Sequence, residues 1–274
     1  MNYNCSICNS ESEKVMEFEK TDIFKCKVCS HYFSKNIKIS PEEVYSTDYF
    51  LQSHKNFFKY PDISLYKKIE NSIKKDLSKD ANILDMGCGT GNFLKFLKDK
   101  DYKNLYGVDF IENNNEIINF MQADLFDYNP TIKFDVIVSN MNIEHIEDLD
   151  KYIKKIESLL NDNGVIIINT INEHSLIYLL SKFLYKLNIK FVSERLYDSH
   201  HVNHFSISSL GLLFKNYNYK TTDKIIKSYP IKSVDVPENK LYYIQKAGVY
   251  IVFLISNLLN MGISQTQFFK KERV

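Results

Sequence analysis

The chain has 274 residues and a formal net charge of +1; 44% of its residues are hydrophobic and 25% are charged. This balance is typical of a globular protein with one large domain and an appendage, or with two modest domains, and it excludes a disordered chain. The near-neutral charge argues against a broad phosphate-binding surface, so nucleic acid is a disfavoured partner.

Two C-x2-C pairs stand near the N-terminus, Cys5 with Cys8 and Cys26 with Cys29, and 17 residues separate the pairs. Such pairs supply four thiolates to Zn²⁺ tetrahedrally and leave no open position, as in structural zinc sites. The N-terminal segment has no apolar stretch behind a basic start, so we expect a reducing, cytoplasmic compartment that favours metal over disulfides. We predict a zinc-ribbon-like head over residues 1–40, either a cover for an acceptor site or an appendage that stabilises the fold.

Short apolar segments alternate with segments of helical spacing between residues 60 and 172. The segments ANILDMG, NLYGVDF, FDVIVSN and GVIIINT are predicted strands. Phe93, Leu94 and Leu97 share one face of a predicted helix, and residues 148–160 show the same period. Strands buried on both faces and alternating with helices indicate a doubly wound, mostly parallel sheet.

The segments that follow predict the end of this sheet. Ser206 is placed to cap a helix over residues 207–217. Residues 219–229 then form a predicted strand, and residues 264–272 form a last strand antiparallel to it.

The segment ILDMGCGTGNF places three glycines after the first of these strands and before a helix. Such a turn lets backbone N–H groups approach a ligand at the switch point of an open sheet. The dinucleotide pattern GxGxxG fails, because its last position counted from Gly87 is Asn92. The spacing is instead D-x-G-x-G-x-G, and its Asp85 would repel a pyrophosphate and favour a cationic amino-acid group.

With these motifs the sequence resembles the class I S-adenosylmethionine (SAM) dependent methyltransferases over roughly residues 60–230. The resemblance implies a Rossmann-like, doubly wound, seven-stranded sheet that is mostly parallel with an antiparallel last strand, and SAM as cofactor. It places the ribose hydroxyls at Asp109, the adenine at Asp124 and Leu125, and the methionine part at Asn140 and Met141. The other cofactor-binding residues on this basis are Asp85, Gly87, Cys88, Gly89, Gly91 and Phe110.

The segments NIEHIED and HHVNHFS resemble a branch that holds ubiquinone-biosynthesis O-methyltransferases and sugar methyltransferases. Deoxysugar C-methyltransferases related to this branch carry a four-cysteine head. The resemblance implies a small-molecule acceptor, foremost a sugar or sugar nucleotide of a surface glycan. A quinone or lipid-linked saccharide is the alternative, and a non-catalytic zinc-ribbon interaction protein with a relic methyltransferase fold is an alternative of another class.

Methyl transfer to a hydroxyl is helped by a general base, for which histidine suits neutral pH. The candidates are His201, which we prefer, His145 and His204; Glu144 would orient a partner. Binding of a metal by the histidines is disfavoured, because they are expected in a loop and the sequence shows no carboxylate or cysteine that completes a set.

We predict a methyltransferase domain over residues 41–274. The resemblance implies that its first segment closes over SAM, with Tyr45 and Tyr49 near the cofactor, although aromatic packing would also explain these tyrosines. Residues 173–205 lie where the family inserts a substrate lid. Residues 237–263 form an apolar helical segment. Burial or a homodimer contact is the favoured explanation for it, and peripheral contact with the inner face of the membrane is the alternative.

Overall fold

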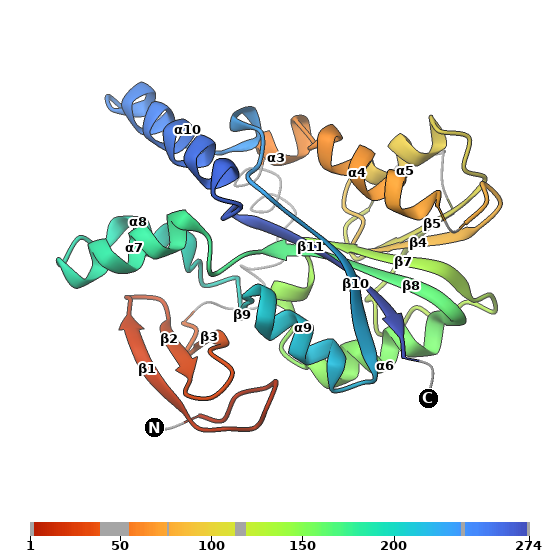
Figure 1. Cartoon of the computed structure of the whole chain (residues 1–274), viewed down its shortest axis with the longest axis horizontal. Helices are drawn as coiled ribbons and strands as arrows, with labels where there is room; N and C mark the ends of the chain where they lie inside the picture. Colours follow the sequence, from red (N-terminus) through yellow and green to blue (C-terminus); the bar gives the residue numbers. More distant parts are fainter. Residues whose placement is uncertain (1–2, 39–54, 76, 113–118, 237–238, 273–274) are drawn as a thin grey trace.

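The computed structural model describes residues 3–38, 55–75, 77–112, 119–236 and 239–272. Within these ranges the chain forms a seven-stranded sheet through the body and a four-stranded sheet that includes the head (Figure 1). The tyrosines at positions 45 and 49 lie outside the described residues, so their predicted place beside the cofactor stays a prediction.

The large sheet has the strand order β10-β11-β8-β7-β4-β5-β6. Its pairings within β6-β5-β4-β7-β8 are parallel, whereas β11 runs antiparallel to both β8 and β10. The predicted doubly wound sheet with an antiparallel last strand is therefore confirmed. The strands are β4 (Asn82–Met86), β5 (Asn104–Asp109), β6 (Asn119–Gln122), β7 (Phe134–Asn140), β8 (Leu160–Ile171), β10 (Tyr219–Lys227) and β11 (Ser264–Lys271).

The strand β6 has no counterpart among the strands assigned from the sequence. It is the edge strand of the sheet, and most of its side chains are exposed or half-buried, so it carries no continuous apolar run.

Helices cover both faces of the large sheet and make three layers (Figure 1). The helices α4 (Ile63–Ile73) and α5 (Asn92–Lys98) pack on one face, and α6 (Leu149–Leu159) and α9 (Ile207–Lys215) on the other. Phe93, Leu94 and Leu97 are all buried, as their spacing predicts. Ser206 caps α9, and its hydroxyl and that of Ser209 form a capping box.

The head consists of β1 (Ser12–Glu17), β2 (Asp22–Cys26) and β3 (Tyr32–Lys35), which form an antiparallel sheet. Its fourth strand, β9 (Asn203–His204), comes from the body and pairs with β3. Cys5, Ile7 and Cys26 share one buried cluster with Phe205 and Leu210. The head is therefore packed onto the body through both a strand pairing and a common core.

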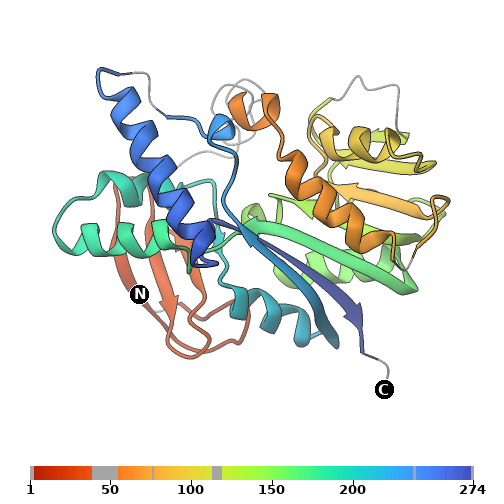
Figure 2. The same ribbon diagram turned by 45° about the horizontal axis from the view of Figure 1, so that its top comes forward.

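Two helical segments project from the body on the side away from α5 (Figures 1 and 2). The helices α7 (Leu176–Lys186) and α8 (Phe191–Leu196) follow β8, and α10 (Tyr242–Leu258) packs against α7. Within the ranges that the structure describes, none of the helices combines the length and apolar composition that crossing a bilayer requires. The short helices α3 (Lys55–Lys59) and η2 (Ile231–Ser233) contact each other, and η2 also contacts α10.

Candidate active site

The glycine turn after β4 requires its glycines for conformational and steric reasons. Gly87, Gly89 and Gly91 all have positive φ, between 50° and 75°. A Cβ on Gly87 would stand 1.8 Å from the side-chain nitrogen of Asn142, so the turn and the segment after β7 meet here. The turn thus forms a close-approach surface at the carboxyl edge of the sheet.

Two carboxylates lie beside this turn, and both are buried. Asp109, at the end of β5, accepts hydrogen bonds from the N–H groups of Gly89 at 2.7 Å and Ile111 at 2.9 Å, and burial raises its pKa. Burial, and then repulsion from Asp109, raise the pKa of Asp85 to about 8. The Oδ1 atom of Asp85 has no hydrogen-bond partner among the described residues. A buried acceptor of this kind fits a ligand that brings donors or positive charge, as the amino-acid part of SAM does.

Two aromatic residues lie at this edge, Phe58 at the turn and Tyr229 at the segment after β7. Phe58 of α3 would be 3.1 Å from a Cβ on Gly89, and its carbonyl accepts a hydrogen bond from the side chain of Asn92. The hydroxyl of Tyr229 lies 3.1 Å from the sulfur of Met141. The sequence did not single out Phe58 or Tyr229; the aromatic segment before residue 60 was the only signal for Phe58.

The residues expected at the adenine lie on the same edge, beyond Asp109. The N–H of Ala123 donates to the carbonyl of Asp109, which holds the two segments together. Asp124 is exposed, and its carboxylate accepts a hydrogen bond from the N–H of Phe126 at 2.8 Å. Phe110 is 45% exposed next to this turn. Asp124 and Phe110 therefore lie near Asp109 at this edge of the sheet, and their contact with an adenine ring stays a prediction.

A second group of titratable side chains follows β7. Glu144 and His145 belong to the short helix η1 (Ile143–His145), and the rings of His145 and His201 are in edge contact with centroids 4.9 Å apart. Asn142, which touches the glycine turn, directly precedes η1. The Glu144, His145 and His201 side chains, named here the histidine corner, therefore adjoin the predicted cofactor site.

Glu144 is fully buried. Its Oε2 accepts a hydrogen bond from the hydroxyl of Thr170 at 2.8 Å, and its Oε1 has no such partner within the described part of the chain. Burial raises the pKa of Glu144 to about 7. Near neutral pH this carboxyl can therefore take up or release a proton.

The other histidines of the segment have different surroundings. The Nδ1 atom of His200 lies 2.6 Å from Asp198 Oδ1, and although burial opposes it, this contact and the nearby histidines hold the pKa of Asp198 below its usual range. His204 is fully buried in β9, with its Nε2 3.0 Å from the hydroxyl of Ser34, and burial lowers its pKa to about 3. His204 therefore holds head and body together and is not exposed to an acceptor.

The histidine corner also has the composition of a metal site. One ligand atom each from Glu144, His145 and His201 lies within 4.8 Å of the others. The Nδ1 of His145 is 2.9 Å from the carbonyl of His200, so its Nε2 can face the group. From the sequence we expected no carboxylate to complete a set with these histidines, but Glu144 lies with two of them. The sequence hid this because η1 and the loop before β9 are distant along the chain.

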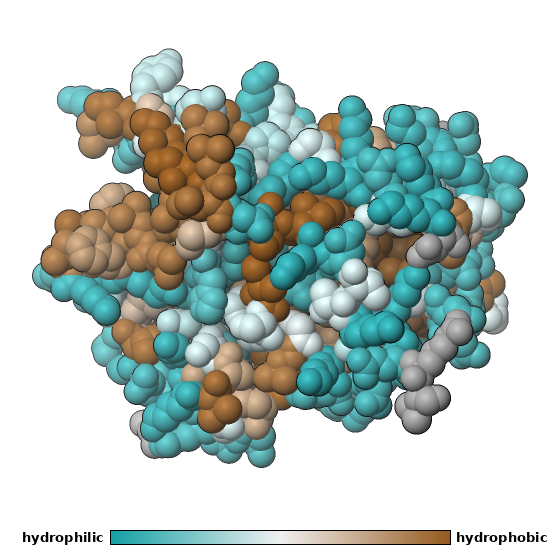
Figure 3. Space-filling model, in the orientation of Figure 1, coloured by the Kyte–Doolittle hydropathy of each residue, from teal (hydrophilic) through white to brown (hydrophobic). Residues whose placement is uncertain are grey.

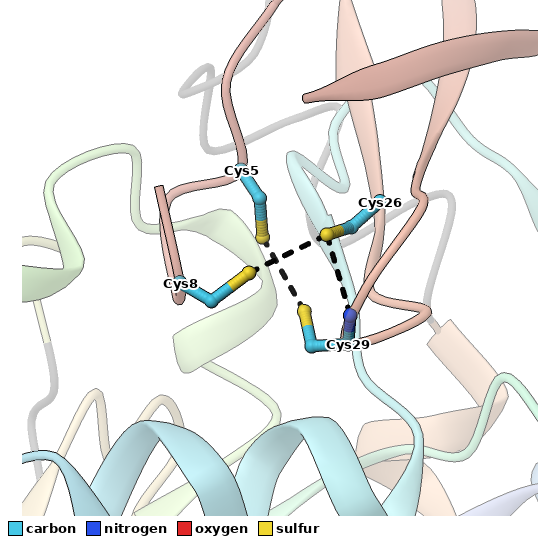
Figure 4. A group of neighbouring side chains, drawn as sticks. All are labelled: Cys5, Cys8, Cys26 and Cys29. Atoms are coloured by element: carbon cyan, nitrogen blue, oxygen red, sulfur yellow. Dashed lines mark hydrogen bonds between the residues drawn. The ribbon is translucent and has the colours of Figure 1, made fainter. Parts of the chain in front are cut away.

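The four cysteines of the head converge on one point (Figure 4). Cys5 and Cys29 sulfurs are 3.5 Å apart, Cys8 and Cys26 sulfurs 3.4 Å apart, and all four lie within 4.8 Å of one another. These distances exceed that of a disulfide bond and suit a tetrahedral Zn²⁺ with thiolate ligands. The N–H groups of Ile7 and Val28 point at the sulfurs of Cys5 and Cys26, as expected for thiolates.

The fold and the glycine turn together define a structural class of protein. Its members have an open sheet of this strand order, with a glycine turn flanked by carboxylates at the carboxyl edge. A family model described as a methyltransferase domain matches residues 63–224, more than half of the chain. The chain therefore belongs to the methyltransferase domain family.

Curated relatives share only part of their length with this chain. The ubiquinone biosynthesis O-methyltransferase of Rickettsia conorii is 26% identical over 144 residues, which cover 48% of either chain. A malonyl-[acyl-carrier protein] O-methyltransferase of Calditerrivibrio nitroreducens is 31% identical over 99 residues, 35% of this chain and 40% of that one. The chain thus spans about half the length of the curated relatives it matches.

Solved structures support the fold. A Burkholderia thailandensis 1,6-didemethyltoxoflavin N1-methyltransferase, determined with its substrate and S-adenosylhomocysteine, superposes with a TM-score of 0.55 at 14% identity, covering 95% of this chain and all of that one. A SAM-dependent methyltransferase of Archaeoglobus fulgidus gives a TM-score of 0.52 at 19% identity, covering 81% and 99%. At these identities the likeness establishes the fold alone.

Proposed function

We propose that the protein transfers the methyl group of SAM to a hydroxyl of an amphiphilic small molecule, a quinone precursor or a lipid-linked saccharide. One observation carries this proposal: the glycine turn with Asp85 and Asp109 lies next to the histidine corner, and Asn142 joins the two. A donor site and a proton-accepting site thus share one edge of the sheet. The curated relatives named ubiquinone O-methyltransferases favour the quinone-like acceptor.

The two carboxylates and the turn would hold the cofactor. When bound, SAM supplies an activated methyl group, so the chain mainly positions the acceptor and removes its proton. Asp109 would accept from the ribose hydroxyls and Asp85 would face the amino-acid part. Asp124, Leu125, Phe110 and Cys88 would line the nucleoside side, and Asn140 and Met141 the methionine side.

In this proposal His201 removes the proton of the acceptor hydroxyl. The buried Glu144, when ionised, stabilises the imidazolium that results, and His145 is held by the His200 carbonyl against the ring of His201. We assign His204 no role in this step, since its ring is enclosed between head and body.

We further propose that the four cysteines hold a structural Zn²⁺. A closed tetrahedral thiolate set has no position for substrate, so the metal supplies folding energy and no chemistry. The four-cysteine head is also the one feature that favours the second candidate acceptor, a sugar or sugar nucleotide, because the resemblance associates such heads with sugar methylation.

Two measurements test this function. Calorimetry with SAM should show binding, and absence of binding at about millimolar SAM would support the relic alternative and exclude the enzyme. Incubation of cell extract with methyl-labelled SAM should then send protein-dependent label into the lipid-extractable fraction. Label confined to water-soluble products would instead establish the sugar-type acceptor.

A further inference from the structure

Exposed apolar side chains gather on two segments that flank the site, residues 176–196 with α7 and α8 and residues 239–263 with α10, together named the helical arm. Among the described residues twenty large apolar side chains are exposed, and fifteen of them belong to this arm. Six lie in the first segment: Leu179, Leu180, Phe183, Leu187, Ile189 and Phe191. Nine lie in the second: Leu241, Tyr243, Ile244, Tyr250, Ile251, Leu254, Ile255, Leu258 and Leu259.

These side chains form one surface because α7 and α10 pack against each other (Figure 3). Phe183 is 58% exposed on α7 and Leu258 is 86% exposed at the end of α10. Soluble monomers seldom expose contiguous apolar patches of this extent unless the patch binds something. The surface therefore indicates a binding partner.

The charge of the arm identifies the kind of partner. Residues 176–196 carry three lysines and one arginine against a single acidic residue, Glu194; residues 239–263 carry Lys240 and Lys246 and no acidic residue. The arm thus has a formal charge of +5 in a chain whose total is +1, and the ion pair of Lys182 with the buried Glu173 leaves four of these positive charges for a partner. A positive, apolar surface complements an anionic lipid surface. A second copy of the same surface would place like charges together, which disfavours a dimer.

The arm is continuous with the candidate active site. Met141, which follows β7 at the predicted cofactor site, packs against a buried cluster that includes Tyr178 of the first segment. Leu196 of the first segment and Ile263 of the second pack against the same cluster. Tyr178 also donates a hydrogen bond to the carbonyl of Leu196, which fixes α7 against α8. A molecule bound at the arm would therefore lie next to the cofactor edge of the sheet.

We propose that the helical arm docks on the surface of an anionic lipid bilayer, with α7 and α10 lying in the interface plane. Apolar side chains enter the headgroup region, and Lys186, Lys190 and Lys240 contact the lipid phosphates. The docking does not require catalysis. Its use, which is to present a membrane-held acceptor to the histidine corner, rests on the proposed function.

Vesicle binding of the full-length, zinc-loaded protein tests the proposal. Cosedimentation should occur with vesicles that contain phosphatidylglycerol, weaken with added salt, and be much weaker with phosphatidylcholine alone. Ile251→Asn with Leu258→Ser should lower the partition coefficient about ten-fold. Lys186→Gln should lower the partition coefficient about five-fold, because one basic residue near an anionic surface contributes about 1 kcal/mol of binding free energy.

Two matched controls should leave binding unchanged: Met121→Gln, an exposed apolar side chain on β6, and Lys98→Gln on α5. Absence of binding to anionic vesicles, or equal loss with controls and arm variants, would overturn the proposal. A different result would also overturn it: the protein does not bind vesicles, sedimentation shows a concentration-dependent dimer, and Ile251→Asn with Leu258→Ser abolishes that dimer. SAM calorimetry on the same preparation separates the outcomes, because loss of docking leaves SAM binding intact and failure of the proposed function removes it.

Discussion

The glycine turn and the histidine corner share the carboxyl edge of one sheet, but they are built in different ways. The turn comes from consecutive residues after β4, and its carboxylates stand at the ends of adjacent parallel strands. The corner is assembled from η1, the loop before β9 and, behind that loop, the head. The hydroxyl of Ser34 donates to the carbonyl of His201 at 2.7 Å, and the Ser34 N–H donates to the carbonyl of Val202 at 2.8 Å.

This difference means that the donor site depends on the body alone, whereas the proposed base depends on the head. Ser34 and His31 hold the loop of His201 from the head side; the His31 ring is 3.1 Å from the side chain of Asn203 in β9. The head therefore supports the corner through the loop of His201. Substitutions should separate the two sites by their effects on SAM binding and on turnover.

The largest expected effect is that of His201→Ala. Loss of a general base typically costs about 10²–10⁴ in rate, and the glycine turn is untouched, so kcat should fall by this factor while the Kd for SAM stays constant. Steady-state kinetics together with calorimetry measure the two quantities. The control is His174→Ala, a half-exposed histidine outside the corner. Unchanged turnover in His201→Ala would refute its role.

Loss of the proposed zinc should affect the histidine corner through the head. Cys29→Ser takes one thiolate from the tetrahedral set, so the head should lose its folding energy and thermal unfolding should begin roughly 10 °C lower. Amide exchange at residues 201–204 should speed up, because β9 loses its partner β3. SAM binding should change little. Cys88→Ser, outside the head, is the matched control for exchange at β9.

The two sites also differ in how far the sequence predicts them. The turn is encoded by glycine spacing and by aspartates that follow apolar strands, so its ligand class and its neighbours Asp85 and Asp109 follow from the order of segments. The corner could be predicted only as a set of histidines. Nothing local distinguishes the enclosed His204 from His201, because the distinction arises from the pairing of β3 with β9 across about 170 residues of chain. The edge strand β6 was also not predicted from the sequence, because its exposed side chains show no apolar pattern and only its pairing with β5 makes it a strand.

The buried carboxyl of Asp85 gives a prediction on stability. Its pKa of about 8 lies above the ordinary value, so the folded state binds its proton more tightly than the unfolded state does, and stability without SAM decreases as pH rises from about 4 to 8. Asp85→Asn should therefore raise the free energy of unfolding at pH 8 by about 1 kcal/mol or more. The same substitution should raise the Kd for SAM about ten-fold. Denaturant titrations at several pH values show this, with the exposed Asp99→Asn as control; a pH-independent gain would contradict the assignment.

The smallest effect should come from Ser34→Ala, which leaves the zinc set and the β3–β9 pairing in place. The substitution removes the hydroxyl that holds the His201 carbonyl and lies 3.0 Å from His204. A single such bond contributes about 1 kcal/mol, so kcat should fall about five-fold with the Kd for SAM unchanged. Ser12→Ala is the matched control: this head serine is equally buried, and its hydroxyl has no hydrogen-bond partner among the residues that the structure describes. A decrease confined to Ser34→Ala, with faster amide exchange at His201, separates positioning of the base from general stability of the head. Equal decreases of kcat in both variants would instead mean that the head only stabilises the fold and does not position the base.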